Sequence, residues 1–238
     1  MRLLIDAGNS RIKWARVVGK TWVETGALPV KDAQDFLSEM ADINEISEIW
    51  VSNVAGDEVA RQISKLGKEK TRFISAKKKE CGVTNNYSET AQLGSDRWAA
   101  LIAAWNTVHR NCLVVNCGTA TTIDALSEHG EFTGGLILPG IMLMQSSLIN
   151  ATNNIKSKQG HYAEFPQNTA DALLSGSIQA TCGAIQRQHA LLKSKNVEVI
   201  LSGGSAPVLC SHLELSLRNV ENLVLNGVEL IAEKVGEE

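Results

Sequence analysis

The sequence shows no excess of charge of either sign and few residues that mark flexible linkers. Lysine and arginine together number 23, aspartate and glutamate 26, and the net charge is −3 over 238 residues. Chains that bind nucleic acid concentrate basic residues on a patch or stripe. Here acidic and basic residues are interleaved, so we expect no nucleic acid partner. Only four prolines are present, and no stretch rich in proline and serine interrupts the chain, so we expect no long linker.

Cysteine and long apolar runs are equally scarce. The five cysteines form no CxxC pair and are odd in number, which argues against a disulfide framework and a zinc site. The apolar runs fall short of the roughly 18 residues that a membrane-spanning helix needs, and the first of them ends at Asp6. We therefore expect a cytoplasmic protein with reduced thiols and no membrane partner.

Several catalytic motifs are missing as well. The chain has no GxxxxGK(S/T) loop and no GxGxxG after its first strand, so neither a Walker-type NTPase nor a dinucleotide-binding fold is supported. It also lacks a GxSxG elbow, and its five histidines do not have the spacing of metal ligands. Covalent hydrolysis and a histidine-rich metal centre are therefore not expected.

Two segments of the sequence repeat one design. An apolar strand near the N-terminus runs into a polar residue, a small residue and a glycine, and an apolar strand near the middle of the chain does the same. At a constant offset, Asp6 falls on Asn116 and Gly8 falls on Gly118. An internal repeat of this kind predicts two lobes of one design.

We place these lobes at residues 1–112 and 113–238, packed directly on one another, and the closing helix near 228–235 is free to pack back on the first lobe. Apolar strands alternate with amphipathic helices, which is typical of an α/β fold. Beyond the two repeated hairpins, we expect strands at 49–54 and 198–201, and helices near 35–40, at 58–66, 99–108 and 170–193, and from about 141.

The repeated glycines indicate phosphate binding. A strand that ends in glycine lets an anion approach the backbone with no Cβ in the way. One such turn alone is more often a plain hairpin, but a matched pair favours a polyphosphate held in a cleft between the lobes. A third glycine turn, after strand 198–201, would let a base or ribose lie against the backbone. The candidate residues are Asp6, Gly8, Asn9, Ser10, Lys13, Gly118, Thr119, Thr121, Gly203 and Gly204.

Three aspartates are candidates for the chemistry. Phosphoryl transfer needs a carboxylate to orient the acceptor hydroxyl and accept its proton. Asp96 precedes an alanine-rich helix and fits that role, although it could also only cap the helix. Asp6 and Asp124 lie near the phosphate turns, where they would either hold Mg²⁺, directly or through water, or stabilise the turns.

The ordered motif set resembles that of type III pantothenate kinases, over nearly the whole chain. Each motif alone is loose, but six in the right order are specific. They are residues 4–10 with Lys13, residues 94–97, 118–124, 134–140, 168–172 and 202–204. The resemblance implies a duplicated, actin-like ATPase fold (ribonuclease H-like). It also implies transfer of the γ-phosphoryl group of ATP to pantothenate, which gives 4′-phosphopantothenate in the first step of coenzyme A biosynthesis.

The resemblance also implies roles for single residues. Asp96 matches the catalytic base, and Thr169 matches the residue that the partner subunit contributes to a pantothenate pocket at the interface of a homodimer. The residues matching the pantothenate-binding positions are Tyr87, Gly94, Ser95, Asp96 and Arg97. The family uses Mg²⁺ and a monovalent cation, K⁺ or NH₄⁺, which implies metal-binding roles for Asp6, Asn116 and Asp124.

One position departs from the family pattern. Asn116 stands where the family usually has aspartate, and its amide oxygen can coordinate a cation but carries no charge. Two other readings stay open. A non-catalytic accessory factor in gene regulation would have a damaged site. Another small-molecule kinase of the superfamily, acting on acetate or a sugar, would have different acceptor motifs.

Overall fold

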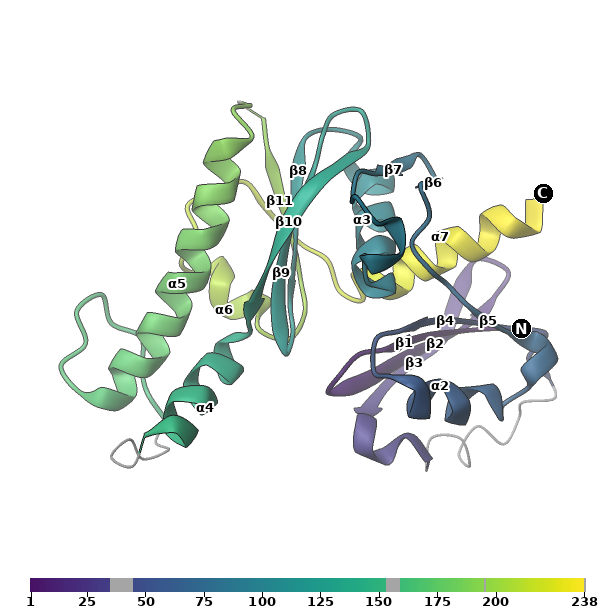
Figure 1. Ribbon diagram of the computed structural model, residues 1–238, viewed down its shortest axis with the longest axis horizontal. Helices are drawn as coiled ribbons and strands as arrows, with labels where there is room; N and C mark the ends of the chain where they lie inside the picture. The colour runs from purple at the N-terminus through teal and green to yellow at the C-terminus, as the bar shows by residue number, and fades with distance from the viewer. Residues whose placement is uncertain (35–44, 153–158, 195, 238) are drawn as a thin grey trace. The chain divides into compact units, whose positions relative to one another are not determined.

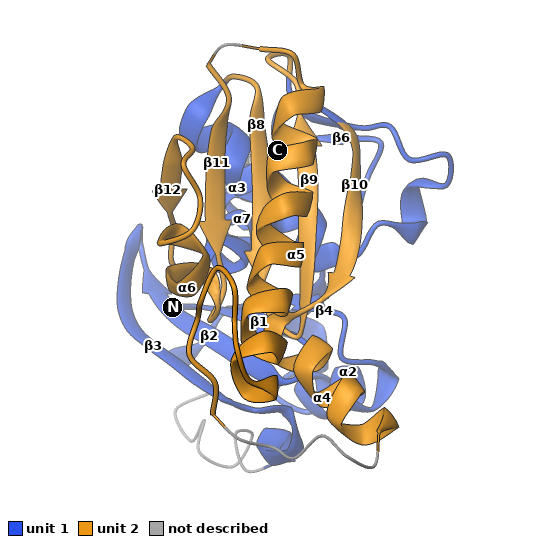
Figure 2. Cartoon of the chain, turned by 90° about the vertical axis from the view of Figure 1, so that its left-hand side faces the viewer, with its two compact units in different colours: residues 1–109, 130–132, 222–238 blue, residues 110–129, 133–221 orange. Residues whose placement is uncertain are grey.

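The computed structural model describes residues 1–34, 45–152, 159–194 and 196–237. The chain divides into two compact units (Figures 1 and 2). Unit 1 comprises residues 1–109, 130–132 and 222–238, and unit 2 comprises residues 110–129 and 133–221. Each unit combines a β-sheet with helices, so the α/β class is confirmed. The lobe boundary near residue 112 stays a prediction, and the helix expected near 35–40 lies outside the described residues.

The sheet of unit 1 has the strand order β3-β2-β1-β4-β5. Its strands are β1 (Arg2–Ala7), β2 (Arg11–Val18), β3 (Thr21–Pro29), β4 (Glu48–Asn53) and β5 (Thr71–Phe73). The first three form an antiparallel meander, and β4 and β5 continue the sheet parallel to β1. Gly19, with φ of 62°, makes the tight turn between β2 and β3. The meander contains the first of the two hairpins that the internal repeat predicts.

Helices cover both faces of this sheet (Figure 1). On one face, Leu3, Ile5 and Val51 pack with Val59 and Ile63 of α2 (Asp57–Ser64). On the other face lie α3 (Ser95–Val108) and α7 (Leu223–Glu237). The two helices pack closely at Gly227 of α7, where a Cβ would lie 1.9 Å from the carbonyl oxygen of Ala99 in α3. The absence of a side chain at Gly227 makes this close packing possible.

Unit 1 also contains short elements beside the sheet. They are η1 (Val30–Asp32), η3 (Lys68–Lys70), η4 (Thr90–Gln92), β6 (Lys79–Glu80) and β7 (Val83–Asn85). β7 pairs with the first residues of β10 (Glu131–Pro139), which places Phe132 opposite Asn85.

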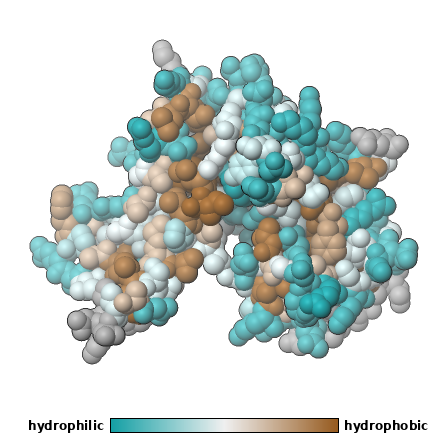
Figure 3. Space-filling view, viewed as in Figure 1, coloured by the Kyte–Doolittle hydropathy of each residue, from teal (hydrophilic) through white to brown (hydrophobic). Residues whose placement is uncertain are grey.

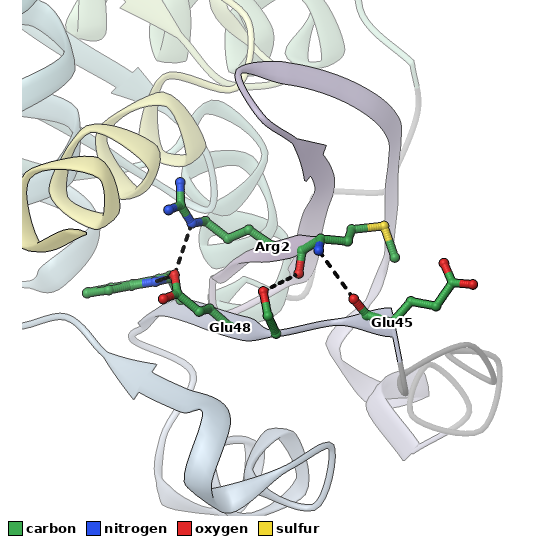
Figure 4. A network of polar contacts seen from close by, with 6 residues as sticks. Arg2, Glu45 and Glu48 are labelled. Carbon is green, nitrogen blue, oxygen red and sulfur yellow. Dashed lines mark hydrogen bonds and ion pairs between the residues drawn. The ribbon is translucent and has the colours of Figure 1, made fainter. Parts of the chain in front are cut away.

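A polar network fixes the start of the central strands of unit 1 (Figure 4). Glu48 of β4 accepts hydrogen bonds from Arg2 of β1 at 3.3 Å and from the indole of Trp50 at 3.1 Å. The N-terminal amine of Met1 donates to the carbonyl oxygen of Glu45 at 3.2 Å. These contacts hold β1 and β4 in the register that positions Asp6.

Unit 2 is built around five strands of the second sheet, which are neighbours in the order β12-β11-β8-β9-β10. Its other elements are β8 (Cys112–Cys117), β9 (Ala120–Leu126), β11 (Glu198–Ser202), β12 (Leu217–Asn219), α4 (Ile141–Ala151), α5 (Thr169–Leu191) and α6 (Ala206–Cys210). The long helix α5 runs across one face of the sheet (Figure 2), where Ile178 and Ile185 pack on Leu113 and Val115. All five cysteines are free thiols, as predicted.

The turn of the second hairpin of the internal repeat is one residue shorter than the turn of the first. Asp6 pairs with Lys13 in the first hairpin, whereas Asn116 pairs with Thr122 in the second. The prediction of a constant offset is therefore wrong beyond the turn. The reason is a shorter turn, since Gly8 donates to the carbonyl of residue 11 but Gly118 donates to the carbonyl of residue 120.

Candidate active site

Three polar side chains lie in a row across the sheet of unit 1. The strand register places Lys13 of β2 and Ser52 of β4 on either side of Asp6 in β1. Leu3 and Ile5 belong to the core that packs on α2, and successive side chains of a strand point to opposite faces. Asp6 therefore lies on the face that α3 and α7 cover.

A buried hydrogen bond sets the start of α3 over this row. The hydroxyl oxygens of Ser52 and Ser95 lie 2.9 Å apart, so the first turn of α3 is held beside Asp6. The N-cap residue is Gly94, which has no side chain to cap the helix, and Oδ1 of Asp96 accepts a hydrogen bond from the backbone N–H of Arg97 at 2.8 Å in the first turn. A Cβ on Gly94 would lie 2.6 Å from Oδ1 of Asp96, which shows that this carboxylate folds back over residue 94.

The two aspartates share a partly desolvated environment. Burial, and then the charge of Asp96, raise the pKa of Asp6 to about 7, while Lys13 acts in the opposite direction. Burial also raises the pKa of Asp96, and the amide and charge of Arg97 oppose that shift. Burial and a like charge are the usual causes of raised carboxyl pKa values, and such groups are concentrated at functional sites.

The residues at this place fit Mg²⁺. A cation beside Asp6 would offset the cost of its buried charge. The described residues contain no group of three or more histidine, cysteine, aspartate or glutamate side chains that could enclose a metal ion by themselves. Mg²⁺ does not need such a group, because it keeps several waters and takes only one or two carboxylates, together with phosphate oxygens.

The predicted acceptor residues lie at the same end of α3. Arg97 is buried, with 6% of its surface exposed. Its Nη1 donates to the hydroxyl of Tyr87 at 2.9 Å, and its guanidinium carbon lies 5.5 Å from the centre of the Tyr87 ring. The structure therefore brings together Tyr87, Gly94, Ser95, Asp96 and Arg97 in one unit.

In unit 2, three glycine turns meet at the end of β8. The N–H of Gly140 donates to the carbonyl of Thr119 at 2.8 Å, and a Cβ on Gly140 would lie 2.2 Å from the carbonyl oxygen of Gly118. Gly203 has φ of 96°, and its Cβ would lie 2.5 Å from the carbonyl oxygen of Cys117. The chain itself therefore requires glycine at 140 and 203.

Gly8 and Gly118 are different, because the chain does not require glycine at either. Neither has a positive φ, and a Cβ would lie 3.4 Å or 3.6 Å from the nearest atom, an ordinary contact. Their own N–H groups close the turns at 3.1 Å and 3.0 Å. The residues that follow are exposed: Asn9 and Ser10 in the first turn, and Thr119 in the second.

The remaining candidates of unit 2 are more scattered. Asn116 is partly buried on the face of β8 opposite the core of Leu113 and Val115, while Asp124 of β9 is almost fully buried. The hydroxyl of Thr121 is buried and has no hydrogen-bond partner among the described residues. Gly204 and Thr169, the first residue of α5, are exposed. Asn116 offers a neutral oxygen, so the predicted site for a monovalent cation carries less charge than the family pattern supplies.

Sequence reasoning did not find Ser52, Asn85 or Phe132. Neither Ser52 nor Asn85 belongs to a sequence motif. Ser52 matters through its hydrogen bond to Ser95, and Asn85 through its pairing with Phe132, and each contact joins distant parts of the chain. A serine directly after the three apolar residues 49–51 was the one available signal for Ser52.

Comparison with known proteins identifies the family. The family model described as type III pantothenate kinase matches residues 2–190. The chain belongs to the type III pantothenate kinase family. A type III pantothenate kinase of Nitrosospira multiformis is 44% identical over 99% of this chain and 92% of its own length. That of Aromatoleum aromaticum is 41% identical over 98% of both chains.

Solved structures show the fold of this family member. A putative Baf family transcriptional activator from Campylobacter jejuni has a TM-score of 0.68 and 22% identity over 99% of this chain and 100% of that one. A putative 2-dehydro-3-deoxygalactonokinase from Sinorhizobium meliloti has a TM-score of 0.59 and 13% identity over 99% of both chains. MreB5 of Spiroplasma citri bound to ADP has a TM-score of 0.54 and 11% identity over 99% of this chain and 97% of that one. The predicted actin-like ATPase fold is confirmed.

Proposed function

We propose that Asp96 is the catalytic base of this pantothenate kinase. As a type III pantothenate kinase, the chain transfers the γ-phosphoryl group of ATP to pantothenate, which gives ADP and 4′-phosphopantothenate, the first step of coenzyme A biosynthesis. The observation that carries the assignment is the position of Asp96, which the Ser52–Ser95 hydrogen bond holds near Asp6.

Each residue has a role in this mechanism. Asp96 orients the primary hydroxyl of pantothenate and takes its proton as the phosphoryl group is transferred. A raised pKa suits a base of this kind, because the carboxylate is then a better proton acceptor than an ordinary one. Arg97 and Tyr87 bind pantothenate. Asp6 would hold Mg²⁺, which would neutralise phosphate charge, and Lys13 adds a further positive charge.

The exposed turns bind the phosphates of ATP. No contact within the chain requires glycine at position 8 or 118. Glycine at both positions lets a ligand approach the backbone closely, because no Cβ is in the way. The hydroxyl and amide groups of Asn9, Ser10 and Thr119 supply donors at the two turns. Gly203 and Gly204 accommodate the nucleoside.

We also propose a cytoplasmic homodimer with lobes at 1–112 and 113–238, in which the closing helix packs back on the first lobe. No described helix has the length and apolarity to cross a membrane. Apolar side chains are exposed on unit 2, and Figure 3 shows brown areas over α4. They are Leu136 and Ile137 of β10, and Met142, Leu143 and Leu148 of α4. A groove of about 500 Å³ between α4 and α5 includes Thr169 in its lining. Exposed apolar surface beside a groove supports an interface between subunits.

The catalytic assignment is tested by ADP release with and without pantothenate. The wild-type chain should release ADP only when pantothenate is present. Asp96→Asn should still unfold in one cooperative transition and lower kcat by about 100-fold or more, the usual contribution of a general base. A variant with the wild-type rate would refute the role of Asp96, and pantothenate-independent release would favour another function.

The shared pocket is tested by mixing two inactive variants. If Thr169 completes the pocket of the other subunit, an Asp96→Asn subunit paired with a Thr169→Arg subunit contains one pocket with both wild-type residues. Co-refolding the two variants should therefore restore up to about a quarter of the activity, the share expected for random pairing with one intact site in each mixed dimer. No recovery in a sample shown to be dimeric would contradict a pocket shared across the interface.

A further inference from the structure

A third aromatic residue lies beside the acceptor pair of unit 1. Phe132, in β10, is fully buried. Its ring centre is 5.2 Å from that of Tyr87, with the two planes tilted by 38°. The guanidinium carbon of Arg97 lies 5.8 Å from the centre of the Phe132 ring and 5.5 Å from that of Tyr87. The cation is therefore within reach of two aromatic rings.

Strand pairing, and not a loop, sets the position of the Phe132 ring. Phe132 lies opposite Asn85 in the pairing of β10 with β7. The buried side chain of Asn85 accepts the backbone N–H of Tyr87 at 3.0 Å and donates to the carbonyl of Thr90 at 3.4 Å. The same residue thus fixes the strand opposite Phe132 and the backbone of Tyr87. Both rings are held on one rigid support.

Burial makes this arrangement important for Arg97. A guanidinium with 6% exposure has lost most of its water, and attraction between a cation and an aromatic face is stronger when the cation is desolvated. The planar guanidinium also stacks on ring faces in a way that a lysine ammonium cannot. Two rings and the Tyr87 hydroxyl together restrict the orientations open to the side chain.

We propose that Phe132 is a positioning residue for pantothenate binding, because its ring holds the guanidinium of Arg97 in the orientation that contacts the substrate. This inference rests on the proposed function, in which Arg97 binds pantothenate. Phe132 acts through Arg97 and does not itself touch the substrate. Its effect should therefore fall on pantothenate and spare ATP.

The first test replaces the ring by an aliphatic side chain. Phe132→Leu should raise KM for pantothenate about tenfold, a change within the range of one cation–π contact, with KM for ATP unchanged. Phe132→Met, which retains more of the side-chain length, should give the same selective change. The matched control is Phe73→Leu, which removes an exposed ring from the edge strand β5 of the same unit and should change neither constant. Equal rises in both KM values, or no rise in KM for pantothenate, would overturn the proposal.

The second test asks whether the effect passes through Arg97. Arg97→Lys keeps the positive charge but removes the plane that stacks on the ring. In that background, Phe132→Leu should raise KM for pantothenate by less than about twofold, because the interaction is already lost. A full tenfold effect would show that Phe132 acts independently of Arg97, and the proposal would fail. If the wild-type enzyme did not phosphorylate pantothenate, the proposed function would fail instead.

Discussion

The partly buried carboxylate of Asp6 should make the substrate-free enzyme less stable than it would be without that charge. Burial and the nearby charge of Asp96 raise its pKa from 3.8 to about 7. One pKa unit corresponds to about 1.4 kcal/mol, so the ionised group costs roughly 4 kcal/mol in the folded state relative to the unfolded chain. An asparagine at this position has the same shape and no charge, but burying its amide also costs about 1–2 kcal/mol. We therefore expect Asp6→Asn to raise the free energy of unfolding at pH 8 by about 2 kcal/mol.

The pH dependence gives the sign of this effect. Above pH 7, Asp6 is ionised in both the folded and the unfolded state, and the folded state bears the full cost. As the pH falls through 7, folded Asp6 takes up a proton and the cost is relieved. Below pH 4 the unfolded carboxyl is protonated as well, and no further change follows. The advantage of Asp6→Asn should therefore be largest at pH 8 and shrink steadily towards pH 5.

Urea unfolding at pH 8 and pH 5.5, without Mg²⁺ or nucleotide, measures this difference. Asp57→Asn is the matched control, because Asp57 is an exposed aspartate of the same unit, and its replacement should give a small difference that is the same at both pH values. Mg²⁺ with ATP should stabilise the wild type but not Asp6→Asn, since only a ligand that binds the folded state raises its stability. The reasoning is refuted if Asp6→Asn is no more stable than the wild type at pH 8, or if its advantage is equal at the two pH values.

Other predictions follow from packing, charge and burial. Gly227→Ala places a Cβ against the backbone of α3 and should lower the free energy of unfolding by about 2–3 kcal/mol, whereas Gly183→Ala, at an open position of α5, should raise it by about 0.5–1 kcal/mol; urea unfolding that ranks the two variants the other way would contradict this packing. Asn116→Asp restores a charge at the predicted cation site, so the ratio of rates in K⁺ and Na⁺ buffers should be larger for the variant than for the wild type, and equal ratios would remove residue 116 from that site. Burial raises the pKa values of three thiols far above neutrality, so no more than two of the five cysteines should react rapidly with a thiol reagent at pH 8 before urea is added; the protected three are Cys112, Cys117 and Cys182.

The elements with strong local signals could be predicted from the sequence. The apolar runs before Asp6 and Asn116 are strands, and the alanine-rich segment after Gly94 is a helix, because burial of a continuous apolar surface decides both. The order of the six motifs pointed to the family, because this comparison needs only the sequence.

The contacts that assemble the candidate site could not be predicted in this way. Ser52 meets Ser95 although the two are 43 residues apart, and Phe132 meets Tyr87 only because β7 and β10 pair in a particular register. A single strand pattern does not specify its partner or its register. The constant offset of the repeat was a wrong prediction for a similar reason. A turn shortened by one residue leaves the apolar pattern intact but shifts every later residue pair of the second hairpin.

The glycines separate what the fold needs from what a ligand needs. Gly140 and Gly203 are required by neighbouring backbone, and Gly203 also by its positive φ, so their presence says little about chemistry. Gly8 and Gly118 meet no such constraint, yet they occupy equivalent places in the two repeated hairpins, and the residues beside them are exposed. The chain itself would tolerate alanine at both places, yet it has glycine at both. The atoms that a Cβ would meet there therefore belong to a ligand and not to the chain. For a member of this kinase family, we propose that the phosphates of ATP are such atoms.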